Sequence, residues 1–171
     1  GAGKAKQYTE YDWDKKAPDK AYFDELMRVS KNQIVWGANH FIEKINKNSS
    51  CWLVWNKKTA GNNADCELAW SSFKTAVRRF DFMWEGFWQE NMKDKEKRIH
   101  PTQKPVALYD WILQNYAKQG DLILDTHLGS GSSRIAAYKG GFNFVGFEID
   151  QEYYEKQEKR FKDFVSQLRM F

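Results

Sequence analysis

Apolar residues along the chain fall into short buried runs and into helix-spaced sets, and the two kinds of segment alternate. The predicted strands cover residues 33–37, 51–55, 67–73, 77–84, 122–124 and 144–147. The predicted helices run from an Asp19 cap to about Val29, over 41–46, from Pro105 to Gly120, over 134–139, and onward from about Gln151. Segments 67–73 and 77–84 resemble two strands around a turn. This alternation predicts an α/β fold with a largely parallel sheet.

Proline and glycine positions predict where one helix begins and ends. Pro105 lies at a first turn, where its missing N–H costs nothing, and Gly120 is expected at the C′ position. The last helix is expected to bury one apolar face, whose members are Tyr154, Phe161, Phe164, Val165 and Leu168. Residues 1–18 and 85–99 are polar and irregular, which is typical of loops.

Composition narrows the class of protein. The 171 residues are most simply one domain, 1–171, that is long enough for a sizeable core. A mean hydropathy of −0.79 and the lack of a long apolar run exclude a membrane span. No charged-then-apolar leader opens the sequence, so we expect a cytoplasmic protein. The two cysteines and three histidines lack metal-site spacing. A net charge of +4 permits nucleic-acid binding without requiring it.

The stretch from Leu122 to Asp150 carries the most chemistry. A strand ends in Asp125, a Gly-Ser-Gly-Ser-Ser turn covers 129–133, and a second strand ends in Glu148. Rossmann-like sheets hold nucleoside-bearing cofactors in this way, with glycines for close approach and an acid for ribose hydroxyls. The third glycine of a dinucleotide fingerprint is missing, and Asp125 would repel phosphate. S-adenosylmethionine is cationic and lacks phosphate, so it fits both departures. A strand-turn-helix unit that binds nothing stays open as an alternative.

A second signal lies at 100–105, with the sequence His-Pro-Thr-Gln-Lys-Pro. Its two prolines favour an extended entry into the following helix. Thr102, Gln103, Lys104 and the helix N-terminus offer several donors to a carboxylate. An ordinary polar loop before a helix is the alternative.

These segments in this order resemble the DNA amino-methyltransferases, which methylate adenine N6 or cytosine N4. The resemblance rests on 100–105, on Asp-x-x-x-Gly-Ser-Gly at 125–131 and on Phe-Glu-Ile-Asp at 147–150. A cofactor motif near the C-terminus matches their circularly permuted β subclass, and segments at 22–39 and 65–70 extend the likeness. It implies a Rossmann-like S-adenosylmethionine-dependent methyltransferase fold, α/β with a mostly parallel sheet and incomplete at the N-terminus.

The resemblance implies cofactor roles within a cofactor-binding part, 100–171. The residues are Asp125, His127, Gly129, Ser130, Gly131, Glu148, Thr102, Gln103 and Lys104. Glu148 falls on the ribose acid, and Thr102 to Lys104 fall on the segment that holds the methionine end. The family usually has Pro-Phe after the motif aspartate, where this chain has Thr126 and His127. His127 either retunes binding or is merely a packed histidine.

No catalytic residue is assigned, because the family's Asp-Pro-Pro-Tyr loop is absent from this sequence. In the family, its acceptors hold the amine hydrogens and its aromatic ring stacks on a flipped base. The prolines here are Pro18, Pro101 and Pro105. The chain is therefore a fragment, a degenerate remnant, or one of two polypeptides that complement each other. Strands 122–124 and 33–36 then either pair directly or leave a gap in the sheet.

Contact with DNA is predicted through cations in or near loops. They are Lys57, Lys58, Arg78, Arg79, Lys93, Lys95, Lys97 and Arg98. Residues 85–99 are a candidate target-recognition loop, and solvated lysines are the alternative. The predicted function is methylation of a flipped base in double-stranded DNA, adenine N6 favoured, or the cofactor-binding fragment of such an enzyme. The competing hypotheses are an inactive remnant that binds DNA or cofactor or associates with itself, and a methyltransferase for RNA or another amine.

Overall fold

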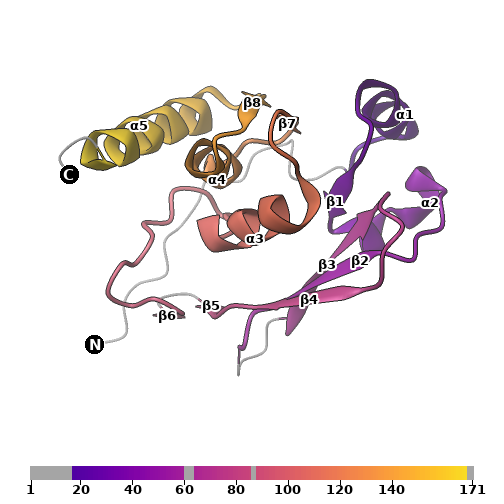
Figure 1. Cartoon of the computed structure of the whole chain (residues 1–171), viewed down its shortest axis with the longest axis horizontal. Helices are drawn as coiled ribbons and strands as arrows, with labels where there is room; N and C mark the ends of the chain where they lie inside the picture. Colours follow the sequence, from indigo (N-terminus) through magenta and orange to yellow (C-terminus); the bar gives the residue numbers. More distant parts are fainter. Residues whose placement is uncertain (1–16, 60–63, 86–87, 169–171) are drawn as a thin grey trace. The chain divides into compact units, whose positions relative to one another are not determined.

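The computed structural model describes residues 17–59, 64–85 and 88–168, which divide into two compact units after Glu90 (Figure 1). The expected loop at 1–18 lies almost wholly outside the described residues. The sequence Gly-Asn-Asn at 61–63 also predicts a loop, over 59–64, and residues 60–63 lie outside the described residues too. No helix in the described ranges is long and apolar enough to cross a membrane.

The first unit is built on a four-stranded sheet in the order β1-β3-β2-β4 (Figure 1). Its elements are α1 Lys20–Val29, β1 Ile34–Trp36, η2 Ala38–His40, α2 Ile42–Ile45, β2 Trp52–Asn56, β3 Cys66–Ser71, β4 Arg78–Asp81, β5 Trp84–Glu85 and β6 Trp88–Gln89. The predicted helices and strands are confirmed, except that 77–84 divides into β4 and the start of β5, and the 3₁₀ turn η2 and β6 are additions. Asp19 caps α1 as predicted, since its carboxylate accepts the Tyr22 N–H at 2.9 Å.

The strand pairing of this unit corrects two sequence predictions. β3 and β4 do not form a hairpin, because β2 lies between them and pairs antiparallel with β3 and parallel with β4. Among the described strands, three pairs are antiparallel and two are parallel, so the sheets are mixed rather than largely parallel. Short connections such as that between β2 and β3 permit antiparallel pairing, whereas parallel pairs need a longer crossover.

The core of the first unit lies between α1, α2 and the sheet. Phe23, Ala38, Ile45 and Trp70 are buried together. The indole of Trp70 donates to the Lys47 carbonyl at 2.9 Å, so the ring is buried with its polar atom satisfied. Most of the aromatic residues in this cluster serve packing rather than ligand binding.

The second unit carries the chemistry predicted from sequence (Figure 1). Its elements are α3 Val106–Tyr116, β7 Leu122–Asp125, α4 Ser132–Gly140, β8 Asn143–Gly146 and α5 Gln151–Leu168. β7 and β8 pair in parallel, with Asp125 opposite Gly146, because α4 carries the chain back to the start of the next strand. The predicted strand, glycine turn, helix and strand are confirmed, and the Rossmann-like α/β class with them.

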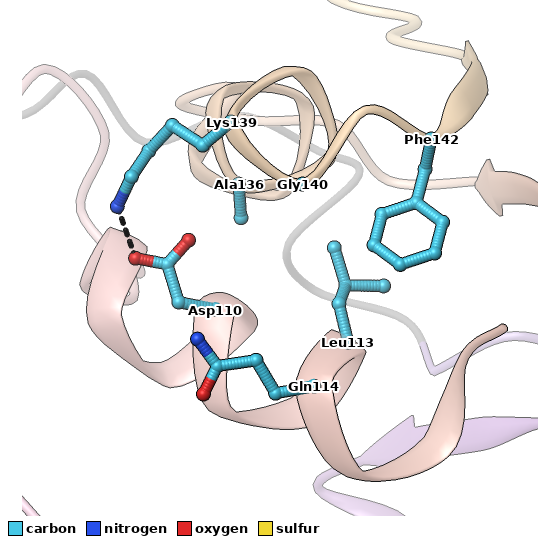
Figure 2. Close-up of a pocket in the computed structure, with 7 residues that line it drawn as sticks. All are labelled: Asp110, Leu113, Gln114, Ala136, Lys139, Gly140 and Phe142. Carbon is cyan, nitrogen blue, oxygen red and sulfur yellow. Dashed lines mark hydrogen bonds and ion pairs between the residues drawn. The ribbon is translucent and has the colours of Figure 1, made fainter. Parts of the chain in front are cut away.

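The contact between α3 and α4 forms the core of this unit. Leu113 of α3 packs with Ala136 and Ala137 of α4. Figure 2 shows Leu113 facing Ala136 and Phe142 across a shallow cavity that the Lys139–Asp110 ion pair spans. The small residues of α4 allow close approach, which fixes where its N-terminal turn lies.

Three sequence predictions about this region need correction. α3 ends at Tyr116 with an Ala117 cap, and Gly120 lies in the turn beyond it. The buried face of α5 carries Tyr153 and Gln157, whereas Tyr154 is 42% exposed. Residues 85–99 are not wholly an exposed loop, since β5 pairs with β6 and Gln89 is buried. Polar side chains on buried faces are invisible to a hydrophobic pattern.

Candidate functional site

Two glycines shape the turn between β7 and α4. Gly129 has φ +52° and Gly131 has φ +71°, a left-handed region that other residues adopt at a cost. A Cβ at Gly131 would lie 3.0 Å from Gln157 Oε1 and 3.2 Å from Gln157 Cβ on α5. The turn therefore needs glycine at 131 for both its backbone angle and its packing.

Asp125 closes this turn from the end of β7. One carboxylate oxygen accepts the His127 N–H at 3.0 Å, and the other accepts the Ser133 hydroxyl at the start of α4. Both ends of the turn are thus tied to one carboxylate. His127 itself is exposed, and its Nδ1 lies 3.1 Å from the Thr126 hydroxyl.

Glu148 holds the same turn from the neighbouring strand. Its Oε2 accepts the Gly129 N–H at 2.7 Å, and its Oε1 accepts the Asp150 N–H at 3.0 Å. The carboxylate is half-buried, so it remains partly accessible to a ligand. Each of its oxygens has further acceptor capacity beyond one amide.

The segment at 100–105 lies directly against the glycine turn. The buried His100 ring would be 3.6 Å from a Cβ at Gly129, and its centroid is 4.2 Å from that of Tyr153 on α5. The two stretches singled out from sequence therefore meet in one place, although α3 and β7 lie between them along the chain.

The three polar residues of that segment have different surroundings. Thr102 is exposed, with its hydroxyl 3.1 Å from His100 Nδ1. Gln103 is buried, and its side chain accepts the Ile99 N–H at 2.8 Å and donates to the Lys97 carbonyl at 3.4 Å. Lys104 is half-buried. Gln103 therefore orders the loop before α3, and Thr102 is the more accessible donor.

A partly buried ion pair lies against the turn. Arg160 of α5 contacts Glu96 at 2.6 Å and donates to the Ser130 carbonyl at 2.8 Å and the Ser132 hydroxyl at 2.9 Å. Burial raises the pKa of Glu96, opposed by Arg160 and by the Val106 N–H that this carboxylate accepts at 2.9 Å. Burial also lowers the pKa of Arg160, opposed by Glu96.

The site as a whole presents acids and backbone at the carboxyl ends of two parallel strands. Such strand ends are where open α/β sheets bind ligands. Asp125 and Glu148 lie on either side of the glycine turn. Two carboxylates disfavour a phosphate here, but they suit hydroxyl donors and a cation.

Comparison with known proteins decides the family. A sequence model described as DNA methylase, for N6 and N4 methyltransferases, matches residues 4–159. The chain belongs to this DNA methylase family. The resemblance derived from residues 100–150 is therefore confirmed.

Two named relatives match part of the chain. It is 36% identical over 76 residues to the type II methyltransferase M.HinfI of Haemophilus influenzae, covering 44% of this chain and 21% of the relative. It is 41% identical over 61 residues to the type II methyltransferase M2.DpnII of Streptococcus pneumoniae, covering 36% and 23%. The matched segments thus span about a fifth of these curated relatives.

Solved structures support the fold over a larger share of the chain. The crystal structure of an M1.HpyAVI–SAM complex matches with a TM-score of 0.60 and 21% identity, covering 82% of this chain and 81% of that chain. A putative DNA modification methylase from Thermus thermophilus, complexed with S-adenosyl-L-methionine, matches with a TM-score of 0.51 and 18% identity, covering 83% and 77%. At these identities the likeness concerns the fold alone.

The cations that were predicted to contact DNA differ in their surroundings. In the first unit, Lys57 pairs with Glu67, Lys58 with Glu90, and Arg79 with Asp81. Arg78 of the first unit is exposed. In the second unit, Lys93 and Lys97 are exposed, whereas Lys95 and Arg98 are half-buried. Cations that already have an acidic partner are weaker candidates for phosphate contact. The exposed cations Arg78, Lys93 and Lys97 therefore stay the stronger candidates for the predicted role.

Sequence reasoning missed the residues that support the turn between β7 and α4. Tyr153, Gln157 and Arg160 of α5 contact it or its neighbour His100, and Glu96 joins them from the preceding loop. The spacing of 153, 157 and 160 is helical, which is a usable signal. It was hidden because two of the three residues are polar.

Proposed function

We propose that residues 1–171 form the S-adenosylmethionine-binding part of a site-specific DNA amino-methyltransferase, with adenine N6 favoured over cytosine N4. One observation carries the proposal: Asp125 and Glu148 bracket a glycine turn at the carboxyl ends of adjacent parallel strands. Family membership supports it, because the DNA methylase model covers most of the chain.

The residues present fit this cofactor chemically. The half-buried Glu148 carboxylate would accept ribose hydroxyls, and the backbone at Gly129 to Gly131 would lie close to the nucleoside. Asp125 favours a cationic ligand, while Thr102 and Lys104 would meet the carboxylate of its methionine end. S-adenosylmethionine, when bound, supplies a methyl group on a positively charged sulfur.

The proposed substrate is double-stranded DNA with its target base flipped out of the helix. Enzymes that act on a base must remove it from the stack, and phosphate contacts then hold the duplex in place. Exposed Lys93 and Lys97 lie in the loop that precedes the candidate site in the sequence. Such a role places the protein with the DNA, in the cytoplasm.

We further propose that the Asp-Pro-Pro-Tyr residues come from outside residues 1–171, which contain no Pro-Pro pair. Among the described strands, β7 pairs only with β8. Leu122 of β7 is 63% exposed and Val145 of β8 is 40% exposed. Parallel sheets are normally buried on both faces, so a two-stranded parallel sheet is a suitable template for a further strand. Self-association through this edge is the competing arrangement.

Calorimetry with two ligands tests the cofactor half of the proposal. We expect saturable heat with S-adenosylmethionine and none with ATP at the same concentration, because Asp125 and Glu148 repel a triphosphate. ATP shares the adenosine, so it is the matched control. Absence of heat with S-adenosylmethionine at millimolar concentration would contradict the proposal and favour a remnant that binds no cofactor.

A transfer assay tests the other half. Residues 1–171 alone should transfer labelled methyl to DNA no faster than a blank, because the acceptors that orient the amine are absent. Robust transfer by this polypeptide would refute the claim that the catalytic residues lie elsewhere. The absent Pro-Pro pair also favours a second function, that of a non-catalytic binding module. Such a module would bind S-adenosylmethionine or DNA, and no added partner chain would restore methyl transfer.

Removing two loop cations tests the DNA contact. Lys93→Gln with Lys97→Gln should weaken duplex binding and reduce the salt dependence by about 0.9 per lost phosphate contact. Lys58→Gln with Arg79→Gln removes equal charge from cations that are already ion-paired, and should change the slope less. Equal slopes for the two double variants, measured by anisotropy across a salt series, would contradict the assignment.

A further inference from the structure

One stripe of α5 contacts both parts of the candidate site. Tyr153, Gln157 and Arg160 are four and three residues apart, so they lie on one side of the helix. Tyr153 packs on His100, which precedes α3, and Gln157 packs on Gly131 in the turn. Arg160 reaches the same turn through Ser130. The helix therefore touches two segments that are distant in sequence.

Arg160 uses its guanidinium as a three-way connector. One terminal nitrogen donates to the Ser130 carbonyl at 2.8 Å and to the Ser132 hydroxyl at 2.9 Å. The other donates to Glu96 Oε2 at 2.6 Å. Both serines are buried, so the turn depends on this donor inside the protein. A lysine has one nitrogen and cannot reproduce the planar fork.

Glu96 extends the connection to α3. Its second oxygen accepts the N–H of Val106, the first residue of that helix, at 2.9 Å. A continuous chain of hydrogen bonds thus runs from the turn through Arg160 and Glu96 to the start of α3. Thr102 and Lys104 lie just before that helix start, in the segment proposed to hold the other end of the ligand.

This ion pair is poorly explained as a source of stability. Burial raises the pKa of Glu96 despite Arg160 and the Val106 amide, and Asp110 of α3 adds repulsion. Burial likewise lowers the pKa of Arg160 despite Glu96. Because desolvation opposes the attraction for both groups, the ion pair is weak evidence of stabilisation. Its geometry, rather than its energy, is then its contribution.

We propose that Arg160, held by Glu96, is a positioning residue that fixes the glycine turn relative to the segment before α3, so that both meet one ligand. This inference rests on the proposed function for its ligand. The positioning itself concerns the ligand-free chain, and it can be measured there.

Hydrogen exchange on the ligand-free chain tests the positioning directly. Arg160→Gln should speed exchange of peptides spanning 126–135 by on the order of tenfold, with Glu96→Gln intermediate. Lys139→Gln is the control. It breaks the ion pair between Lys139 of α4 and Asp110 of α3, and this pair does not touch the turn (Figure 2). Unchanged exchange in Arg160→Gln, or equal exchange in Lys139→Gln, overturns the proposal whether or not any cofactor binds.

Affinity and stability separate positioning from simple support. S-adenosylmethionine should bind roughly tenfold more weakly to Arg160→Gln and also to Arg160→Lys, since the fork is what matters. The raised pKa of Glu96 means that the wild type loses stability as pH rises from the usual glutamate value through the raised one. Glu96→Gln should lack that pH-dependent loss, because an amide does not titrate, but it leaves the Arg160 charge without its anionic partner and should unfold earlier at neutral pH. Full rescue of affinity by Arg160→Lys would show that the pair only supports the fold.

Discussion

Gly131→Ala should destabilise the chain by roughly 2–5 kcal/mol and weaken S-adenosylmethionine binding at least tenfold. The residue has φ +71°, which costs an alanine roughly 1–2 kcal/mol. Its new Cβ would also approach Gln157 to 3.0 Å and 3.2 Å, and relief of that overpacking costs about 1–3 kcal/mol more. Urea unfolding measures the first effect, and calorimetry measures the second.

Gly141→Ala is the matched control for this prediction. Gly141 caps the other end of α4 with φ +70°, but its nearest non-neighbouring atom is 4.0 Å away. It therefore carries the backbone cost, roughly 1–2 kcal/mol, without the clash. Its effect on ligand affinity should be small. If both variants lose equal stability and equal affinity, the packing of Gln157 against the turn has no role.

Glu148→Ala should weaken S-adenosylmethionine binding roughly 100-fold or more. The variant loses a charged acceptor for ribose hydroxyls, and such hydrogen bonds contribute about 1.5–3 kcal/mol each. It also removes the acceptor of the Gly129 and Asp150 amides, which should lower the free energy of unfolding by roughly 1–3 kcal/mol. Glu148→Gln should be intermediate, because one oxygen remains.

Glu152→Ala controls for the loss of a carboxylate near the start of α5. Its side chain pairs with Lys156 on the exposed helix surface, away from the turn. It should leave affinity and stability nearly unchanged, as surface pairs contribute little. Calorimetry of the three variants at one salt concentration gives the comparison. Wild-type affinity in Glu148→Ala would remove Glu148 from the site.

Local patterns were sufficient for the elements that carry the site. Asp19 caps α1 because a short acidic side chain can reach the third amide of its helix, and no distant residue is involved. The order of β7, the glycine turn, α4 and β8 follows from apolar runs and glycines that lie close together in the sequence. The family resemblance implied that residues 100–105 lie near the glycine turn. The position of the His100 ring beside Gly129 shows where the two segments meet.

Several of the predictions that failed needed partners that are distant in the sequence. The hairpin of 67–73 with 77–84 was wrong because β2 inserts between the two strands. The predicted apolar face of α5 was wrong in part. Phe161 and Phe164 pack against Tyr138, but Tyr154 and Leu168 are exposed, and Gln157 and Arg160 contact the turn instead.

The sequence by itself determined the turn between β7 and α4, since backbone preferences and acid positions act over a few residues. Only the tertiary structure decided what holds that turn. Glu96 and Arg160 are 64 residues apart, and no period in the sequence links them. Their contact exists because α3, α4 and α5 pack together, and that packing places the guanidinium behind Ser130. Side-chain partners of this kind depend on the whole fold, whereas turns and caps do not.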